Sequence, residues 1–408
     1  MERRLLRREG KTMANMIDYV RWRGDIPFHQ VPLGEVDALV LSYLSYMPFG
    51  SLVSADYGEK TATIAQAAAY FYENGLSSSC MIDSEESDCL LMDALRTSVR
   101  FGSVQIAGFA DRYDEKTQEQ FSAVTFMPET GPAFIAFRGT DSTVVGWKED
   151  FNMSFSREVP AQRTALAYAA QAIRVLDRPV ILGGHSKGGN LAAYAGVFAP
   201  EDVQADIQCI YNFDGPGFNE QVFALPEFKR LNMRIHTFVP QSSMIGILLW
   251  HAEPFTVVRS DAGGLLQHNP YSWQVMGGRM LTLPERTNES RFAEETIKHW
   301  LSELQPEARS TIIDGIYSVL SASDGRNISD LFEAKNVRAI LRAVGTMDEE
   351  TKDVIVDAFR RLGSSLKETI PDWLDRTTDQ LFTMIAQKAT DKEMKRELKK
   401  ENKKENNV

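Results

Sequence analysis

The chain has 408 residues, 43% of them hydrophobic and 25% charged, which is the composition of a globular protein with room for one large domain and additions. Its formal net charge of -11 argues against a general nucleic-acid binder, because neutralising phosphates requires clustered Lys and Arg. The three cysteines are sparse and lack metal-ligand spacing, so we expect reduced thiols, no metal site and a cytoplasmic protein.

The start of the chain carries no recognisable targeting signal. Residues 1–9 are charged throughout, no apolar region of a signal peptide follows, and Met13 is a second candidate start. The longest uncharged apolar piece, residues 244–250, is far shorter than the roughly 18 residues that cross a bilayer. We therefore expect no transmembrane segment, while transient contact with a membrane surface stays compatible with the sequence.

Residues 1–100 are predicted to form a helical segment packed on a core. Helical spacing of apolar residues recurs there, at residues 35–47, 63–72 and 90–99. Residues 286–390 also carry helical spacing, which predicts a helical C-terminal region. Residues 391–408 are nearly all Lys, Glu and Asn, and we expect them to form a disordered charged tail.

Between these regions, predicted strands alternate with helices. The strands are expected at residues 105–113, 121–126, 133–137, 180–182, 207–213, 234–239 and 255–260, and a helix at 161–176. This alternation predicts an α/β-hydrolase fold over residues 101–285, with a mostly parallel central sheet flanked by helices. In such a sheet the catalytic residues lie on loops at the carboxyl edge.

The pentapeptide Gly184-His185-Ser186-Lys187-Gly188 lies between a predicted strand and a helix-forming run. It matches Gly-x-Ser-x-Gly, the nucleophile elbow, in which the serine hydroxyl projects from a strained turn. Ser186 is therefore the predicted nucleophile, and the alternative is a tight turn with an inert serine. His185 should point away from that hydroxyl and serve in packing or support. Thr140 ends the preceding strand, where its N–H and hydroxyl could complete an oxyanion hole.

A serine nucleophile needs a histidine within hydrogen-bond reach and a third group that orients the ring. In α/β-hydrolases the order along the chain is serine, acid, histidine. His268 lies on the glycine-containing loop after the last predicted strand and is the predicted base. Of the other histidines after Ser186, His236 lies within a strand, His251 precedes the last strand and His299 lies beyond the sheet.

Several groups compete for the role of the acid. The strand 234–239, after which the orienting carboxylate usually lies, is followed by Pro240-Gln241-Ser242-Ser243 without Asp or Glu. Asp214 ends the preceding strand and is the predicted acid, with an Asx-type cap of its own turn as the alternative role. Asp261, Glu253 and a Ser-His dyad assisted by Ser243 remain open.

Two motifs carry a resemblance to class 3 (fungal-type) lipases over residues 105–275. They are Phe137-Arg-Gly-Thr140, with Trp147 and Asp150 downstream, and Gly184-His-Ser-Lys-Gly-Gly189. With Ile17-Asp-Tyr-Val-Arg-Trp22, Phe213-Asp-Gly-Pro-Gly-Phe218, Val239-Pro-Gln-Ser-Ser243 and Gln267-His268, the chain resembles an uncharacterised lipase-like α/β-hydrolase family of Gram-positive bacteria. The resemblance implies Ser186 as nucleophile, His268 as base, Thr140 and the Lys187 N–H as oxyanion donors, and residues 142–156 as the lid.

Lys187 stands where those lipases have an apolar residue. A cation near the site would favour an anionic or phosphate-bearing substrate, whereas the alternative is a surface ion pair with a carboxylate such as Asp150. Residues 244–250 lie next to the expected site and are candidates either for binding an acyl chain or for covering the core.

The predicted function is a serine hydrolase that cleaves a carboxylic ester through an acyl-enzyme on Ser186, with lipid-derived esters among the candidate substrates. Neither a metal nor an organic cofactor is expected, and the expected ligand is a small-molecule or lipid ester. The alternative is a catalytically weak hydrolase fold that binds a partner, favoured by the missing carboxylate after strand 234–239. An acyltransferase is also compatible with the sequence.

Overall fold

The structure, a computed structural model, describes residues 14–74, 85–141, 144–153, 156, 158–288, 290–291 and 294–295. The chain divides into two units, residues 1–304 and 305–408, and all described residues lie in the first. The predicted C-terminal helices, apart from their first few positions, and the predicted charged tail lie outside the described residues.

The described residues form an α/β architecture around one mixed sheet of nine strands in the order β1-β2-β3-β4-β5-β6-β7-β8-β11. The strands are β1 (Ala62–Thr63), β2 (Gln105–Asp114), β3 (Glu119–Met127), β4 (Ala133–Phe137), β5 (Val180–His185), β6 (Ile207–Phe213), β7 (Ile235–Pro240), β8 (Phe255–Val258) and β11 (Thr282–Leu283). Strands β4 to β8 run parallel, and the outer pairs are antiparallel. β9 (Val275–Met276) and β10 (Arg279–Met280) form a separate ribbon. The predicted fold class is confirmed.

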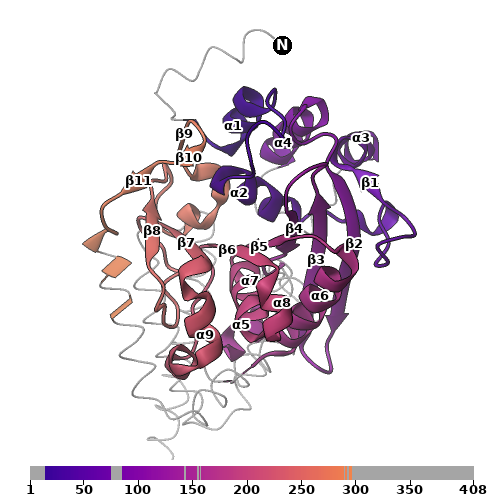
Figure 1. Ribbon diagram of the computed structural model, residues 1–408. Coiled ribbons are helices and arrows are strands. Elements are labelled where there is room, and N and C mark those ends of the chain that lie inside the picture. The colour runs from indigo at the N-terminus through magenta and orange to yellow at the C-terminus, as the bar shows by residue number, and fades with distance from the viewer. Residues whose placement is uncertain are drawn as a thin grey trace, which may run out of the picture. The chain divides into compact units, whose positions relative to one another are not determined.

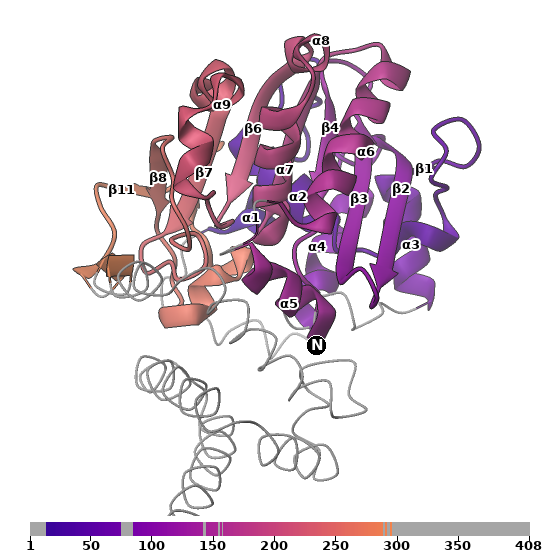
Figure 2. The ribbon, with the colours of Figure 1, turned by 90° about the horizontal axis from the view of Figure 1, so that it is seen from below.

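Helices cover both faces of this sheet. Their bounds are α1 (Met16–Arg23), α2 (Glu35–Leu44), α3 (Ile64–Asn74), α4 (Glu85–Thr97), α5 (Val144–Asn152), α6 (Pro160–Leu176), α7 (Lys187–Phe198), α8 (Glu201–Ala205) and α9 (Pro226–Leu231). Figures 1 and 2 show α1, α2 and α4 over one face and α6, α7 and α9 over the other. Within the described ranges, no helix combines the length and apolar character needed to cross a bilayer.

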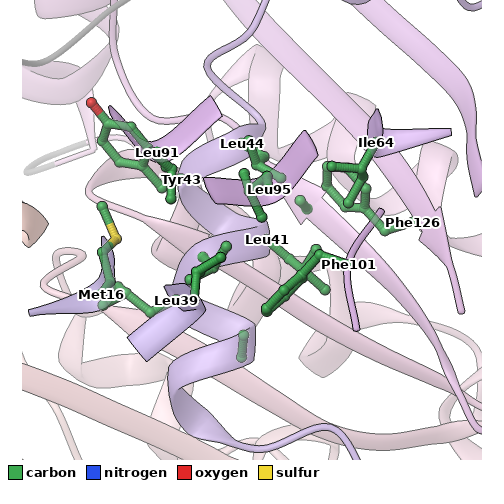
Figure 3. Packing of buried hydrophobic residues seen from close by; sticks show 14 of the residues in the cluster. Met16, Leu39, Leu41, Tyr43, Leu44, Ile64, Leu91, Leu95, Phe101 and Phe126 are labelled. Carbon is green, nitrogen blue, oxygen red and sulfur yellow. The ribbon is translucent and has the colours of Figure 1, made fainter. Parts of the chain in front are cut away.

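Alternation of side chains along the strands divides the core into two layers. In β4, Phe134 and Ala136 pack with the N-terminal helices, whereas Ile135 and Phe137 pack with α6 and α7. Every residue of α2 except Glu35 is buried. Figure 3 shows its leucines packed among side chains from the other N-terminal elements and β3. A helix that is apolar around most of its circumference is expected to be buried in this way.

The predicted strands are each present, and the predicted helices at residues 35–47, 63–72, 90–99 and 161–176 correspond to α2, α3, α4 and α6. The sequence prediction did not include the short elements α1, α5, α8, α9, β1, β9, β10 and β11, so the strand at residues 255–260 is not the last one. Elements of this kind contribute few periods of a pattern, so their formation depends on tertiary packing more than on local sequence.

A buried ion pair joins the N-terminal helices to the loop that precedes β2. Arg100 Nη2 lies 2.6 Å from Asp37 Oδ2, and both side chains are at most 1% exposed. The same guanidinium donates to the carbonyl oxygens of Ile26, Val31 and Pro32, and it lies 3.9 Å from the ring centroid of Phe28. The groups that Arg100 bonds are all acceptors, and its guanidinium is the cation that neutralises the buried Asp37 carboxylate.

Arg100→Met should lower the free energy of unfolding by about 3–5 kcal/mol, because the Asp37 carboxylate would be left buried without its cation. Urea denaturation followed by circular dichroism measures this loss. Arg96→Met is the matched control, because that guanidinium is 46% exposed and its pair with Asp93 should contribute less than about 1 kcal/mol. Equal losses in the two variants would contradict the role of the buried pair.

Candidate active site

The predicted elbow has the backbone geometry that its sequence indicates. β5 ends at His185 and α7 begins at Lys187, so Ser186 makes the reversal with φ 59° and ψ -135°. Such angles are strained for a residue with a Cβ atom. A Cβ on Gly184 would lie 2.3 Å from the backbone of Gly188, and one on Gly188 would lie 2.1 Å from the Phe137 carbonyl oxygen. The two glycines therefore allow strand, helix and neighbouring strand to meet around the serine.

His268 and Asp214 are brought together by the structure. His268 Nδ1 lies 2.7 Å from Asp214 Oδ2, and the aspartate side chain is 1% exposed. Asp214 Oδ1 accepts hydrogen bonds from the Ser243 hydroxyl and from the Gly246 N–H. Because both carboxylate oxygens are bonded, the aspartate is held in one orientation, and Nδ1 of the imidazole carries the proton that it donates.

The other candidate acids do not contact His268. Glu253 accepts hydrogen bonds from His251 Nδ1 and the Thr237 hydroxyl, both at 2.8 Å, and Asp261 is exposed. The turn-capping role considered for Asp214 belongs to Asn212 instead, whose Oδ1 accepts from the Gly215 N–H at 2.9 Å. Ser243 assists the carboxylate and does not replace it.

The elbow contacts His268 through His185, the residue that precedes the serine. The rings of His185 and His268 are in contact, with centroids 4.4 Å apart and planes tilted by 35°, and His185 Nε2 lies 2.8 Å from the His268 carbonyl oxygen. Among the described residues, no hydrogen bond joins the Ser186 hydroxyl to the His268 ring. Bonds between a nucleophile and its base are often long until substrate binds. The Ser186 hydroxyl and the His268 ring thus have no formed hydrogen bond, and His185 supplies the contact between the elbow and His268.

The candidate oxyanion donors lie on two sides of the elbow. The N–H of Lys187 is the first of α7 and belongs to the N–H groups that a helix leaves without an internal partner. The Thr140 hydroxyl donates to Asp150 Oδ2 from α5. The sequence-based expectation that this hydroxyl is available to the substrate is therefore wrong, and the backbone N–H of Thr140 remains the candidate donor.

The Lys187 side chain does not extend toward the site. Its ammonium is 1% exposed, lies 2.7 Å from Glu149 Oε2, and also donates to the backbone carbonyl and the side-chain amide oxygen of Gln120. Both sequence-based expectations for it, a cation facing the substrate and a surface ion pair with Asp150, are wrong. The burial of this ammonium could not be predicted from the sequence, because its partners Glu149 and Gln120 come from two different elements, α5 and β3.

Residues 244–250 cover part of the core. Ile247 and Leu249 are buried, and Leu249 packs with Met153 and Val159 beside α5. The core-covering alternative is thus favoured over an open acyl-binding loop. Of the segment expected to correspond to a lipase lid, residues 144–152 form α5, whereas residues 142, 143, 154 and 155 and the Trp147 side chain lie outside what the structure describes.

Two further histidines lie away from the elbow. His251 binds Glu253, and His236 stacks on Tyr211 with ring centroids 5.4 Å apart. His236 lies within strand β7 as predicted, with its side chain exposed. Within the described ranges, no group of three or more His, Cys, Asp or Glu side chains could hold a metal ion.

The fold and these side chains define an α/β protein with a serine elbow and a histidine–aspartate pair beside it. A family model described as Mbeg1-like matches residues 95–318, more than half of the chain. The chain therefore belongs to the Mbeg1-like family, which is lipase-like. The expected resemblance to a lipase-like family is confirmed in this form, and a Gram-positive source stays a prediction.

Two lipases are among the similar solved structures. The Rhizomucor miehei lipase propeptide complex is 15% identical, with a TM-score of 0.34, and the match covers 54% of this chain and 65% of that one. M37 lipase is 15% identical, with a TM-score of 0.31, and the match covers 52% of this chain and 67% of that one. The chain thus spans slightly less than two thirds of the Rhizomucor miehei lipase chain. No curated protein matches the chain.

Lys187→Met should lower the free energy of unfolding by about 3–5 kcal/mol, because it leaves the Glu149 carboxylate buried without a counter-charge. Lys187→Met/Glu149→Gln should recover part of this loss, since the second change removes the stranded charge. Urea denaturation of the two variants and the wild type measures both effects. A single variant as stable as the wild type, or a double variant less stable than the single one, would contradict the buried pair.

Asp150 should make stability depend on pH. Burial raises the pKa of Asp150 from 3.8 to about 6, against the opposing effects of the Lys187 charge and the Thr140 hydrogen bond. The folded protein therefore holds this proton more tightly than the unfolded chain, so the stabilisation is present below about pH 4 and is lost as pH rises through about 6.

Asp150→Asn keeps an acceptor for Thr140 but cannot ionise. Its free energy of unfolding relative to the wild type should thus rise by about 2–3 kcal/mol between about pH 4 and about pH 7. Urea titrations at several pH values measure the difference. Asp93→Asn, whose side chain in the wild type is 57% exposed, is the control and should show little pH dependence. A constant difference for Asp150→Asn would show that this carboxyl group titrates normally.

Proposed function

We propose that the protein is a serine hydrolase that cleaves a carboxylic ester through an acyl-enzyme on Ser186. The single observation that carries the proposal is the 2.7 Å contact between His268 Nδ1 and Asp214 Oδ2, beside a strained serine elbow. A bonded histidine–carboxylate pair next to a serine at positive φ is the arrangement that nucleophilic catalysis requires.

In the proposed reaction, Ser186 Oγ attacks the ester carbonyl and His268 Nε2 accepts its proton. Asp214 holds the ring with Nδ1 protonated and stabilises the imidazolium that forms. The N–H groups of Lys187 and Thr140 stabilise the oxyanion of the tetrahedral intermediate. The intermediate expels the alcohol, which takes the proton from His268. Water then attacks the acyl-enzyme and gives its proton to His268. The acid is released as Ser186 leaves and takes this proton back.

The substrate class follows from the charges around the elbow. The Lys187 ammonium is neutralised by Glu149 and its hydrogen bonds, so it supports no preference for an anionic head group. An uncharged ester is therefore the proposed substrate at the scissile bond, with lipid-derived esters and transient contact with a lipid surface included in the proposal.

Labelling with a fluorophosphonate probe tests the proposal. Wild-type protein should be labelled covalently, and Ser186→Ala should not be labelled. His268→Ala and Asp214→Asn should reduce the labelling rate on the order of a thousandfold or more, because the serine would lose its base or the correct tautomer of that base. Gel fluorescence against time measures these rates, and hydrolysis of p-nitrophenyl esters of increasing acyl length then defines the acyl group.

Ser122→Ala is the matched control, because Ser122 is buried in β3 and its hydroxyl has no hydrogen-bond partner among the described residues. It should be labelled like the wild type. Wild-type protein that is folded by circular dichroism but is not labelled would contradict the hydrolase proposal and favour the partner-binding alternative.

A further inference from the structure

One tyrosine from the N-terminal helical segment is bonded to the centre of the elbow. Tyr46 lies just after α2, is 1% exposed, and its hydroxyl lies 3.1 Å from His185 Nδ1. The same hydroxyl lies against Gly139, where a Cβ would lie 2.0 Å from the hydroxyl oxygen. The hydroxyl therefore lies between the turn that bears Thr140 and the residue before Ser186.

The contacts of His185 fix which of its nitrogens carries the proton. His185 Nε2 lies 2.8 Å from the His268 carbonyl oxygen, which can only accept, so Nε2 is protonated. Nδ1 must then accept, and it accepts from the Tyr46 hydroxyl. Burial, together with the neighbouring His268, lowers the pKa of His185 well below its usual value. The ring is therefore a neutral link with one defined tautomer.

This link ends on the main chain of the predicted base. Through Nε2–H, His185 restrains the His268 carbonyl, while its ring packs against the His268 ring in a tilted arrangement with centroids 4.4 Å apart. Because His185 is neutral, it places no positive charge against a ring that must itself accept a proton. A protonated His185 would oppose that step by electrostatic repulsion.

The N-terminal helices restrain the same loop at a second point. The Tyr271 hydroxyl, three residues after His268, lies 2.7 Å from Asp88 Oδ1, which also accepts from Tyr43 at 2.8 Å. Asn15 Nδ2 donates to the Tyr271 carbonyl oxygen at 3.0 Å. The loop that bears His268 is thus anchored to α2 and α4 and to the start of α1.

We propose that Tyr46 is a positioning residue for the reaction, acting through His185 to hold His268 beside Ser186. This inference rests on the proposed hydrolase function. The hydroxyl of Tyr46 selects the His185 tautomer that binds the His268 main chain. Because the hydroxyl also lies against Gly139, it connects the loop that bears His268 to the turn that bears Thr140. Tyr46 itself does not touch the reacting atoms.

Tyr46→Phe retains the buried ring and removes only the hydroxyl. It should lower the rate constant of fluorophosphonate labelling about tenfold, the effect of one lost buried hydrogen bond. With an activated ester the loss should appear in kcat and leave KM nearly unchanged, because positioning of the base affects the chemical step. His185→Phe should lose at least as much, since it removes both bonds of the link.

A double-mutant cycle separates positioning from a general structural role. If Tyr46 acts through His185, Tyr46→Phe/His185→Phe should be no slower than His185→Phe alone. Tyr19→Phe is the matched control, because this tyrosine of α1 is also buried and hydroxyl-bonded, but its hydroxyl donates to Asp37 Oδ1 at 2.9 Å and not to an elbow residue. The labelling rate of Tyr19→Phe should equal that of the wild type. Its thermal midpoint should change by a small amount, similar to the change in Tyr46→Phe.

The tautomer gives a measurement that does not depend on activity. Nitrogen-15 spectra of histidine-labelled wild type should show His185 neutral and protonated on Nε2 from about pH 5.5 to about pH 8. A free histidine is mostly charged at the lower end of this range. Tyr46→Phe should lose this single tautomer. A wild type with His185 protonated on Nδ1 would overturn the inference.

The labelling outcomes distinguish this inference from the function on which it rests. If the wild type is labelled and Tyr46→Phe is labelled at the same rate, or if the two losses are additive, the positioning role is wrong and the hydrolase proposal stands. If folded wild type is not labelled, the hydrolase proposal fails and the positioning role fails with it.

Discussion

The reversal of the backbone at Ser186 is the constraint on which the site depends. In the parallel register of β5 and β6, His185 pairs with Phe213, and the Ser186 N–H donates to the Phe213 carbonyl oxygen at 2.9 Å. Asp214 is therefore the residue directly beside the serine in the next strand. Because Asp214 can orient the histidine from this position, no carboxylate is needed after β7. The loop after β7 instead supplies Ser243, whose hydroxyl donates to the Asp214 carboxylate.

Three carboxylates near the elbow have different roles because their partners differ. Asp214 is bonded through both oxygens, and Glu149 is paired with the Lys187 ammonium. Asp150 bonds Thr140 through one oxygen, while its other oxygen is buried without a partner among the described residues, which accords with a pKa raised to about 6. In the proposed reaction, the positive character at the oxyanion would therefore come from N–H groups and the start of α7, because the Lys187 charge is neutralised by Glu149.

The sequence predicted the parts of the site that follow from chain order and local pattern. Ser186, Asp214 and His268 each follow a strand, β5, β6 and β8 respectively. The edge of the sheet at which they lie could therefore be inferred before their contacts were known. The partners of Lys187 could not, because Glu149 comes from a short helix with little periodicity. The role of Tyr46 could not be predicted for a different reason. The pattern of α2 predicts which face is buried but not which polar group a buried hydroxyl contacts. In the structure, the closeness of this hydroxyl explains the glycine at position 139, where a Cβ would have no room.

The N-terminal helices are part of the site's framework although the family match begins at residue 95. Residues of α2 share one hydrophobic cluster with Ile181 of β5, Phe213 of β6 and Trp273 near His268. Polar groups buried in such a cluster are costly unless bonded, and Tyr43 and Tyr46 find their partners in α4 and β5. The same packing that buries these tyrosines therefore restrains the histidine loop. The arrangement of the site is consequently a property of residues on both sides of position 95, because Asn15, Tyr46 and Asp88, which precede the matched region, bond His185 or the loop that bears His268.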